Sequence, residues 1–330
     1  MTDYKAIFGK KIKFLTSDLS MSTATEGEVF YSSTDEEFKV GVNVRSWSAG
    51  GNLNTARAFL AGAGTQTAGL VFGGLVQPPY SAASEEYNGS AWTEGNDLNL
   101  ARESLGGGGT QTAGIAFGGQ DSTAAKNETE TYDGSSWTEV NNLSTARGQI
   151  GGVGIQTAAL AFAGRLAPGP AGGPTTSALS EEYNGTSWAE GNDLNANKNR
   201  VGGAGTQTAA LCFARAPNVT EEYDGTSWTA GGDLNDPRLR PGGAGTQTAG
   251  LAFGGIPTSA TSTNATEEYD GTSWTSVPTG NLGTARYGNA GAGIQTTGLT
   301  AGGDTGPGTA QTNATEEYNH TITLKTVTDS

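Results

Sequence analysis

The side chains that most often carry enzyme chemistry are scarce in this sequence. Its 330 residues contain one histidine, His320, and one cysteine, Cys212. A glycan-degrading enzyme would need two carboxyl groups about 5 to 9.5 Å apart. The acids that stand outside the repeated phrases described below, and that could form such a pair, are Asp121, Glu128 and Asp304. With so few candidates, we expect no catalytic residues and no enzyme activity.

No pattern in the sequence indicates a metal or cofactor site. Two adjacent glutamates, as in Glu85-Glu86, precede most of the repeated tyrosines. Neighbouring residues of a strand point to opposite faces, so such a pair does not form one shared site. No stretch has the spacing of a known calcium-binding loop. His320 is expected at the surface, and the apolar neighbours of Cys212 predict a small core residue. We therefore predict no metal and no cofactor.

The charge of the chain argues against nucleic acid as a partner. Its net charge is −15, whereas nucleic-acid binding requires a basic surface. Apolar runs such as AALAFAG (158–164) are too short to span a bilayer, and the first residues lack the apolar stretch of a secretory signal. We expect no membrane insertion. Lys10, Lys11 and Lys13 make the N-terminus a basic arm, which either docks on a partner or is a solvated tail.

One set of residues recurs six times along the chain. Each copy has a tryptophan, then a basic residue, then a glutamine 19 or 21 residues after the tryptophan, and a closing tyrosine. The tryptophans are Trp47, Trp92, Trp137, Trp188, Trp228 and Trp274; the basic residues are Arg57, Arg102, Arg147, Lys198, Arg238 and Arg286; the glutamines are Gln66, Gln111, Gln156, Gln207, Gln247 and Gln295; the tyrosines are Tyr87, Tyr132, Tyr183, Tyr223, Tyr269 and Tyr318. A spacing of 40 to 51 residues between glutamines indicates a repeat array or a propeller.

Each copy is expected to fold as four short antiparallel strands. The glycine-rich stretch before the glutamine is the first strand, and TAGLAFGG (248–255) is typical of the second. TEEYDG (266–271) is typical of the third, and its Asp-Gly pair predicts a tight hairpin into the tryptophan strand. Small residues in the first strand suit the crowded centre of a ring, and the phenylalanines that end the second strand should pack between blades, with Ala301 breaking the series. The sequence predicts an all-β fold: a six-bladed β-propeller of four-stranded blades over residues 46–330, preceded by an arm and hairpin in residues 1–45.

The offset between the two kinds of strand predicts how the ring closes. Trp47 precedes every tyrosine strand, and no tryptophan follows Tyr318. The simplest closure lets the Trp47 strand complete the blade of Tyr318, which removes two open sheet edges. The alternative is that TITLKTV (321–327) forms its own outer strand and leaves Trp47 to begin a partial blade.

Sequence variation is concentrated in one connection per copy, the loop after the second strand. These loops are 75–84, 120–129, 165–180, 216–220, 256–266 and 304–315, whereas the links after the fourth strand look uniform. Because strands alternate in direction, all these loops should lie on one face of the ring. Binding residues often lie on loops of a rigid scaffold. Aromatic and basic residues dominate binding hot spots, so the candidate contacts are Tyr80, Lys126, Arg165 and Arg215. Neutral drift of surface loops is the alternative.

The combination of paired glycines, tyrosine, tryptophan and spaced arginine resembles the kelch repeat of β-propellers. The pattern departs from it at Ala163-Gly164 and Ala214-Arg215. GEVFYSSTDEEFKVGV (27–42), expected to form two strands, resembles a hairpin of tail-fibre and other appendage proteins of tailed phages. The phrases GTQTAGLAFGG (245–255) and EEYNGTSW (181–188) resemble virion structural proteins of marine cyanophages.

These resemblances imply a virion protein whose arm docks on other virion proteins. Its propeller would be displayed, in the manner of a tail fibre, to recognise a host-surface glycan or protein. The analogy with fibres implies a homo-oligomer such as a trimer, although the sequence contains no coiled coil to enforce one. The alternative is a capsid or tail decoration protein that recognises nothing on the host.

Overall fold

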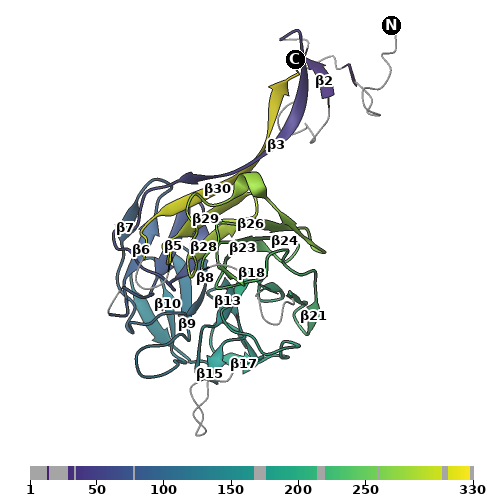
Figure 1. Ribbon diagram of the computed structural model, residues 1–330. Helices are drawn as coiled ribbons and strands as arrows, with labels where there is room; N and C mark the ends of the chain where they lie inside the picture. The colour runs from purple at the N-terminus through teal and green to yellow at the C-terminus, as the bar shows by residue number, and fades with distance from the viewer. Residues whose placement is uncertain are drawn as a thin grey trace. The chain divides into compact units, whose positions relative to one another are not determined.

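The computed structural model describes residues 13–14, 29–32, 35–76, 79–166, 176–213, 220–258, 261–306 and 311–327. The chain divides into two compact units, Trp47–Tyr318 and a smaller one drawn from Met1–Ser46 and Asn319–Ser330. The larger unit is a ring of six antiparallel sheets (Figure 1), and its first strands contact one another in a closed order. The predicted all-β, six-bladed propeller is confirmed.

The blades repeat one strand order from the axis outward. Blade 1 is β4 (Ala61–Thr65), β5 (Ala68–Phe72), β6 (Ser84–Tyr87) and β7 (Trp92–Glu94); blade 2 is β8 (Gly106–Thr110), β9 (Ala113–Phe117), β10 (Thr129–Tyr132) and β11 (Trp137–Val140); blade 3 is β13 (Gly151–Ile155), β14 (Ala158–Phe162), β16 (Ser180–Tyr183) and β17 (Trp188–Glu190). Blade 4 is β18 (Gly202–Thr206), β19 (Ala209–Phe213), β20 (Glu221–Tyr223) and β21 (Trp228–Ala230); blade 5 is β23 (Gly242–Thr246), β24 (Ala249–Phe253), β26 (Thr266–Tyr269) and β27 (Trp274–Ser276); blade 6 is β28 (Ala290–Ile294), β29 (Thr297–Ala301), β30 (Thr315–Thr326) and β3 (Glu37–Ala49). Two short pairs, β12 (Arg147–Gly148) with β15 (Arg165–Leu166) and β22 (Arg238–Leu239) with β25 (Ile256–Pro257), and a 3-10 turn, Pro278–Gly280, lie in the connections.

Glycines in the first strands allow the blades to meet at the axis. A Cβ atom placed on Gly291 would lie 2.2 Å from the carbonyl oxygen of Gly243 in the neighbouring blade. One on Gly62 would lie 2.7 Å from the carbonyl oxygen of Gly291. A larger side chain would push the first strands apart, so the glycine-rich phrase is repeated because the ring has a crowded centre.

Each blade buries one ion pair between the basic residue of its entry link and the first glutamate of its third strand. Arg57 lies 2.7 Å from Glu85, and both side chains are almost fully buried. The equivalent pairs are Arg102–Glu130, Arg147–Glu181, Lys198–Glu221, Arg238–Glu267 and Arg286–Glu316. The other oxygen of Glu85 accepts a hydrogen bond from the backbone N–H of Asn54 at 2.7 Å, so this carboxylate also fixes the turn of the link.

The remaining repeated side chains join each blade to the next. Between blades 2 and 3, the ring of Phe117 lies 4.9 Å from that of Trp188, and Trp188 Nε1 donates to Thr129 Oγ1 at 2.9 Å. The amide of Gln156 donates to the carbonyl oxygens of Gly114 and Tyr132. The predicted packing of the phenylalanines between blades is confirmed.

The second of the two adjacent glutamates points to the opposite face of the strand from the first, and it accepts a hydrogen bond from a tyrosine of the following blade. Tyr132 Oη donates to Glu86 Oε1 at 2.5 Å, and the same contact joins Tyr87 to Glu317, Tyr223 to Glu182, Tyr269 to Glu222 and Tyr318 to Glu268. In blade 2 the position is Thr131, so Tyr183 of blade 3 has no glutamate opposite it.

The Trp47 strand closes the ring as predicted. β3 pairs with β30 at the outer edge of blade 6. The Trp47 ring lies 4.9 Å from Phe253 and 5.1 Å from Tyr318, and its Nε1 donates to Thr266 Oγ1 at 3.0 Å. Residues 321–326 continue β30 and do not form a separate outer strand, so the alternative closure is wrong.

The smaller unit contains the hairpin expected near the N-terminus. β2 (Val29–Ser32) pairs antiparallel with the first part of β3, with Val29 opposite Val40, and β1 (Lys13–Phe14) pairs parallel with β2. Within this unit the backbone N–H of Val327 donates to the carbonyl oxygen of Phe38 at 2.7 Å. Among the described residues there is no helix long and apolar enough to cross a membrane.

Two truncations test the closure of the ring. Removing residues 1–50 deletes the outer strand of blade 6 with Trp47, and burial lost with a tryptophan typically costs about 3–5 kcal/mol. We expect the free energy of unfolding to fall by at least about 3 kcal/mol in denaturant titrations. Removing residues 1–44 retains Trp47 and should cost far less. Equal stability of the two truncated chains would contradict the closure.

The tyrosine contacts between blades provide a matched pair of variants. Tyr132→Phe removes a hydrogen bond to the half-buried Glu86 carboxylate, and we expect a loss of about 1–2 kcal/mol in the free energy of unfolding. Tyr183→Phe, opposite Thr131, should cost clearly less. Similar losses for both variants would show that the carboxylate contact adds no stability.

Candidate functional site

The loops after the second strands and the links that enter the first strands meet on one face of the ring. In blade 1 the loop bridges to the link through Ala58–Leu75 and folds back through Leu75–Tyr80. Blades 2 and 6 repeat this arrangement through Gln120 and Asp304, and β12–β15 and β22–β25 do so in blades 3 and 5. Loops and links thus share one face, as the alternation of strand direction predicts.

At the centre of this face, six equivalent residues surround the axis. They stand seven positions before the repeated glutamines: Phe59, Ser104, Gln149, Arg200, Arg240 and Gly288. All six have left-handed backbone conformations, with φ between 53° and 61°. A backbone hydrogen bond joins each of them to at least one neighbour around the axis, as from the N–H of Arg240 to the carbonyl of Arg200 at 2.7 Å and from that of Ser104 to the carbonyl of Phe59 at 2.8 Å. These hydrogen bonds hold the residues in a conformation that favours glycine.

The left-handed conformation makes the choice of side chains informative. For a residue other than glycine it costs on the order of 1–3 kcal/mol, and such strain is often found at functional sites. Only blade 6 uses glycine at this position. Five blades instead carry an aromatic ring, a hydroxyl, an amide and two guanidinium groups. The position combines a conformational cost with diverse chemistry.

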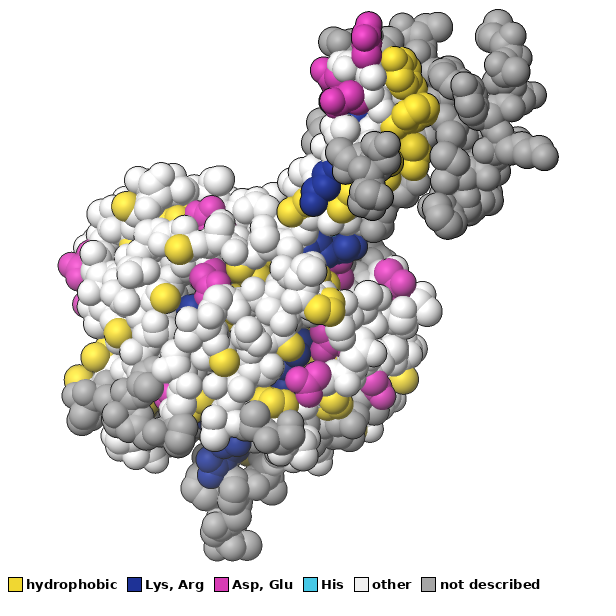
Figure 2. All heavy atoms as spheres, turned by 45° about the horizontal axis from the view of Figure 1, so that its top comes forward, with side chains coloured by type: hydrophobic (Ala, Val, Ile, Leu, Met, Phe, Trp, Pro, Cys, Tyr) yellow, Lys and Arg dark blue, Asp and Glu magenta, His cyan; other side chains and the backbone are white. Residues whose placement is uncertain are grey.

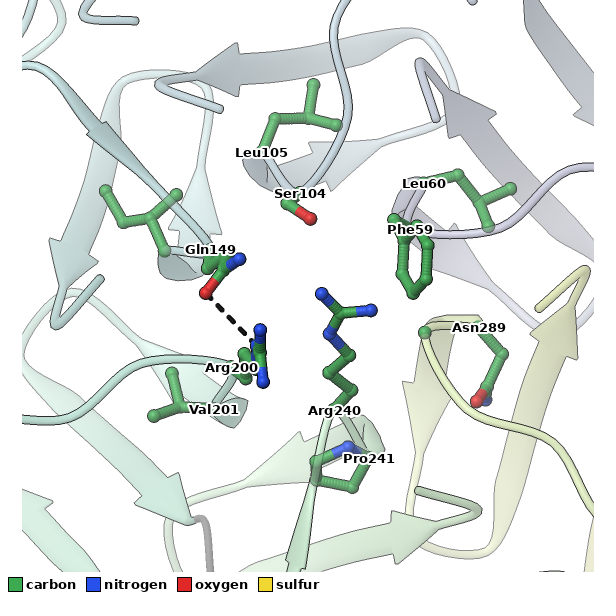
Figure 3. Close-up of a pocket in the computed structure, with 12 residues that line it drawn as sticks. Phe59, Leu60, Ser104, Leu105, Gln149, Arg200, Val201, Arg240, Pro241 and Asn289 are labelled. Carbon is green, nitrogen blue, oxygen red and sulfur yellow. Dashed lines mark hydrogen bonds between the residues drawn. The ribbon is translucent and has the colours of Figure 1, made fainter. Parts of the chain in front are cut away.

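These side chains line an axial pocket of about 100 Å³, with Leu60, Leu105, Ile150, Val201, Pro241 and Asn289 behind them (Figure 3). Arg200 and Arg240 point toward its centre, and Arg200 Nε donates to Gln149 Oε1 at 3.2 Å. The guanidinium carbon of Arg240 lies 4.1 Å from the centre of the Phe59 ring. Further along the axis, a second cavity of about 120 Å³ is lined largely by the glycines of the first strands.

Burial and like charge shape the electrostatics of the pocket. Desolvation, followed by repulsion from Arg200, lowers the pKa of Arg240 to about 10. Desolvation raises the pKa of Glu103, although a hydrogen bond from Gln120 and the charge of Arg240 oppose the shift. The second oxygen of Glu103 has no hydrogen-bond partner among the described residues. Two guanidinium groups therefore line the pocket, and a desolvated carboxylate lies close enough to interact with one of them.

The structure describes three of the four loop residues predicted as contacts. Tyr80 is half-buried, and desolvation with the charges of Glu103 and Asp121 raises its pKa. Lys126 forms an ion pair with Asp121 at 2.7 Å. Partial desolvation opposes it, but hydrogen bonds from Lys126 and Thr123 hold the pKa of Asp121 below its usual range. Arg165 and residues 120–125 line a hollow of about 170 Å³ between the loops of blades 2 and 3.

The structure describes only some of the other predicted positions. Arg215, Lys10 and Lys11 lie outside the described residues, and of Lys13 only the backbone, in β1, is described. Asp304, one of the acids considered for catalysis, is buried and accepts a hydrogen bond from the N–H of Gly306 at 3.0 Å. Cys212 is fully buried, as predicted for a core residue, and desolvation raises its pKa to about 12.

The axial residues were not predicted from the sequence. The links after the fourth strand look uniform, but this is wrong for their last part, where the three residues that follow the basic residue differ from copy to copy. Aligning the six copies on the glutamine shows this variation, and the axial residues are the middle position of the three. The sequence alone does not say which of the three positions faces the axis.

No protein-family model and no curated protein matches this chain. Among solved structures, that of the bacterial protein YjhT is similar, with a TM-score of 0.67 and 11% sequence identity. The similarity covers 83% of this chain and 99% of the other. At this identity it shows the propeller fold alone.

The strain at the axis can be measured at Ser104. Ser104→Gly removes the Cβ atom that disfavours a φ of 53°, and we expect it to raise the free energy of unfolding by about 1 kcal/mol. Ser104→Ala keeps the Cβ atom and should give no such gain. A glycine variant no more stable than the alanine variant would show that the left-handed position carries no strain.

Proposed function

We propose that this chain is a virion appendage protein, similar to a tail fibre, whose propeller recognises a host-surface glycan or protein. Recognition uses the face formed by the loops after the second strands and the axial pocket. The observation that carries the proposal is that chemical variation among six near-identical repeats gathers on this face. In this proposal the protein catalyses no reaction and needs no metal or cofactor.

The scaffold contacts support a division between support and recognition. The ion pairs, the Tyr–Glu and Trp–hydroxyl hydrogen bonds and the Phe–Trp contacts recur from blade to blade with little change. The opposite face consists of the repeated glutamine turns and Asx-Gly hairpins, whose main departures are the exposed Ile155 and Ile294. Variable loops on a rigid scaffold are the usual site of binding.

The surface favours a polar ligand over an apolar partner. In the view of Figure 2 the hydrophobic side chains of the ring are scattered singly and form no broad patch. Large exposed apolar patches usually mark protein or membrane interaction sites. Glycans, by contrast, are bound through hydroxyl, amide and charged groups such as those of the axial pocket.

The placement on a virion rests on sequence resemblance. Residues 27–42 resemble a hairpin of phage appendage proteins, and the repeats resemble virion proteins of marine cyanophages. In this proposal Lys10, Lys11 and Lys13 dock on other virion proteins. Several copies, such as a trimer, would add avidity to weak single contacts. The proposed function involves neither nucleic-acid binding nor insertion into a membrane.

The decisive experiment changes the loops without touching the scaffold. Replacing residues 76–79 and the segment between Leu166 and Thr176 with Gly-Ser links spares Ala83 and Leu179, whose carbonyls accept hydrogen bonds from Arg57 and Arg147. We expect normal incorporation into particles and reduced adsorption to host cells. The matched control, Ile155→Thr with Ile294→Thr on the opposite face, should adsorb normally.

The other outcomes separate the alternatives. Unchanged adsorption by the loop variant would refute recognition through these loops. Failure of a folded loop variant to enter particles would instead favour a structural decoration protein.

A further inference from the structure

Two of the few cations of this chain occupy neighbouring positions at the axis. The sequence has 18 lysines and arginines, and six of them form the buried ion pairs of the blades. Arg200 and Arg240 instead line the axial pocket. Among the described residues Arg240 forms no ion pair, although Glu103, Asp304 and Tyr287 contribute to its electrostatic environment. Since no described carboxylate forms an ion pair with Arg240, the charge of its guanidinium group is available for a ligand.

The surrounding residues position the Arg240 side chain. A cation–π contact with Phe59 holds the guanidinium in place, and such contacts contribute about 0.5–2 kcal/mol. Phe59 can lie there because the axial residue of blade 6 is a glycine: a Cβ atom on Gly288 would lie 2.3 Å from Phe59 Cδ1. Phe59 and Gly288 thus act as positioning residues for Arg240.

The shape and charge of the pocket suit an oxyanion. The charge of Arg200 disfavours the charged form of Arg240, and an anion between the two guanidinium groups would relieve that repulsion. The planar guanidinium group matches the two oxygens of a carboxylate. About 100 Å³ accommodates one such group with part of a sugar ring, while Gln149 and Ser104 offer an amide and a hydroxyl for sugar hydroxyls.

We propose that the axial pocket binds the carboxylate of an acidic sugar, with Arg200 and Arg240 as its direct ligands. That the carboxylate belongs to a sugar rests on the proposed recognition function. That the ligand is negatively charged rests on the two arginines of the pocket. The rest of a longer glycan would extend over the loops.

Titration of the purified full chain with D-glucuronate tests the proposal. Glucose is the neutral counterpart and acetate the free carboxylate, and binding can be followed by calorimetry or NMR. We expect millimolar binding of glucuronate and much weaker binding of both others. Arg200→Gln and Arg240→Gln should each weaken glucuronate binding about tenfold or more, because each loses a charged hydrogen bond. Arg240→Lys, which keeps the charge without the planar fork, should lie between.

Thermal unfolding of every variant shows whether it is folded. The charge-matched control is Lys325→Gln, which replaces an exposed lysine of the smaller unit and should bind glucuronate normally. The proposal is overturned if glucuronate does not bind or if both arginine variants bind it as the parent does. Acetate binding as tightly as glucuronate would show an ion site without sugar contacts and would also overturn it.

Particles that carry Arg240→Gln separate this inference from the proposed function. If the purified chain binds glucuronate through the arginines while particle adsorption is unchanged by both Arg240→Gln and the loop exchange, recognition of the host is refuted and the pocket assignment stands. Lost adsorption in the loop variant with no glucuronate binding leaves recognition standing and refutes the pocket assignment.

Discussion

The buried ion pair between each entry link and the third strand is the interaction on which the propeller depends. Taking a guanidinium and a carboxylate out of water is tolerable only when each satisfies the other, and loss of one partner typically costs about 3–5 kcal/mol. In blade 1, Arg57 meets Glu85 and also donates to the carbonyl of Ala83, while Glu85 holds Asn54. One pair therefore fixes the link, the end of the variable loop and the third strand together. Six copies of this contact set the geometry of the whole loop face.

This arrangement leaves the binding face free to vary. The contacts that hold the loop ends use backbone carbonyls, which are present whatever the side chains are. The residues between those ends can then change in length and chemistry without a cost to the ring. The same applies at the axis, where backbone hydrogen bonds fix the left-handed residues and do not depend on which side chain each blade carries.

The scaffold could be predicted because its residues recur at fixed spacings, whereas the axial site was missed because its residues differ from blade to blade. The blades, the Phe–Trp contacts and the closure by Trp47 follow from residues that recur at fixed spacings, because each has the same neighbours in every blade. The partner of Arg57 could not be predicted, since spacing alone does not say that its side chain turns toward Glu85. The axial residues were missed because a positive φ is imposed here by the neighbouring blades and not by glycine in the sequence. Lys126, predicted as a contact, forms an ion pair with Asp121 of its own loop, a local pairing that composition does not reveal.

The position of β3 has a consequence for biosynthesis. The outer strand of blade 6 is made before any other part of the ring, and its partner β30 is made last. At about 5–20 residues per second, the Trp47 segment leaves the ribosome some tens of seconds before Tyr318 is added. During that interval the nascent chain has stacked blades but open edges, which invite pairing with other chains. Only when translation is complete can β30 pair with β3 and close the ring. A prematurely terminated chain would keep unpaired strand edges, by which chaperones and proteases can distinguish it from the finished protein.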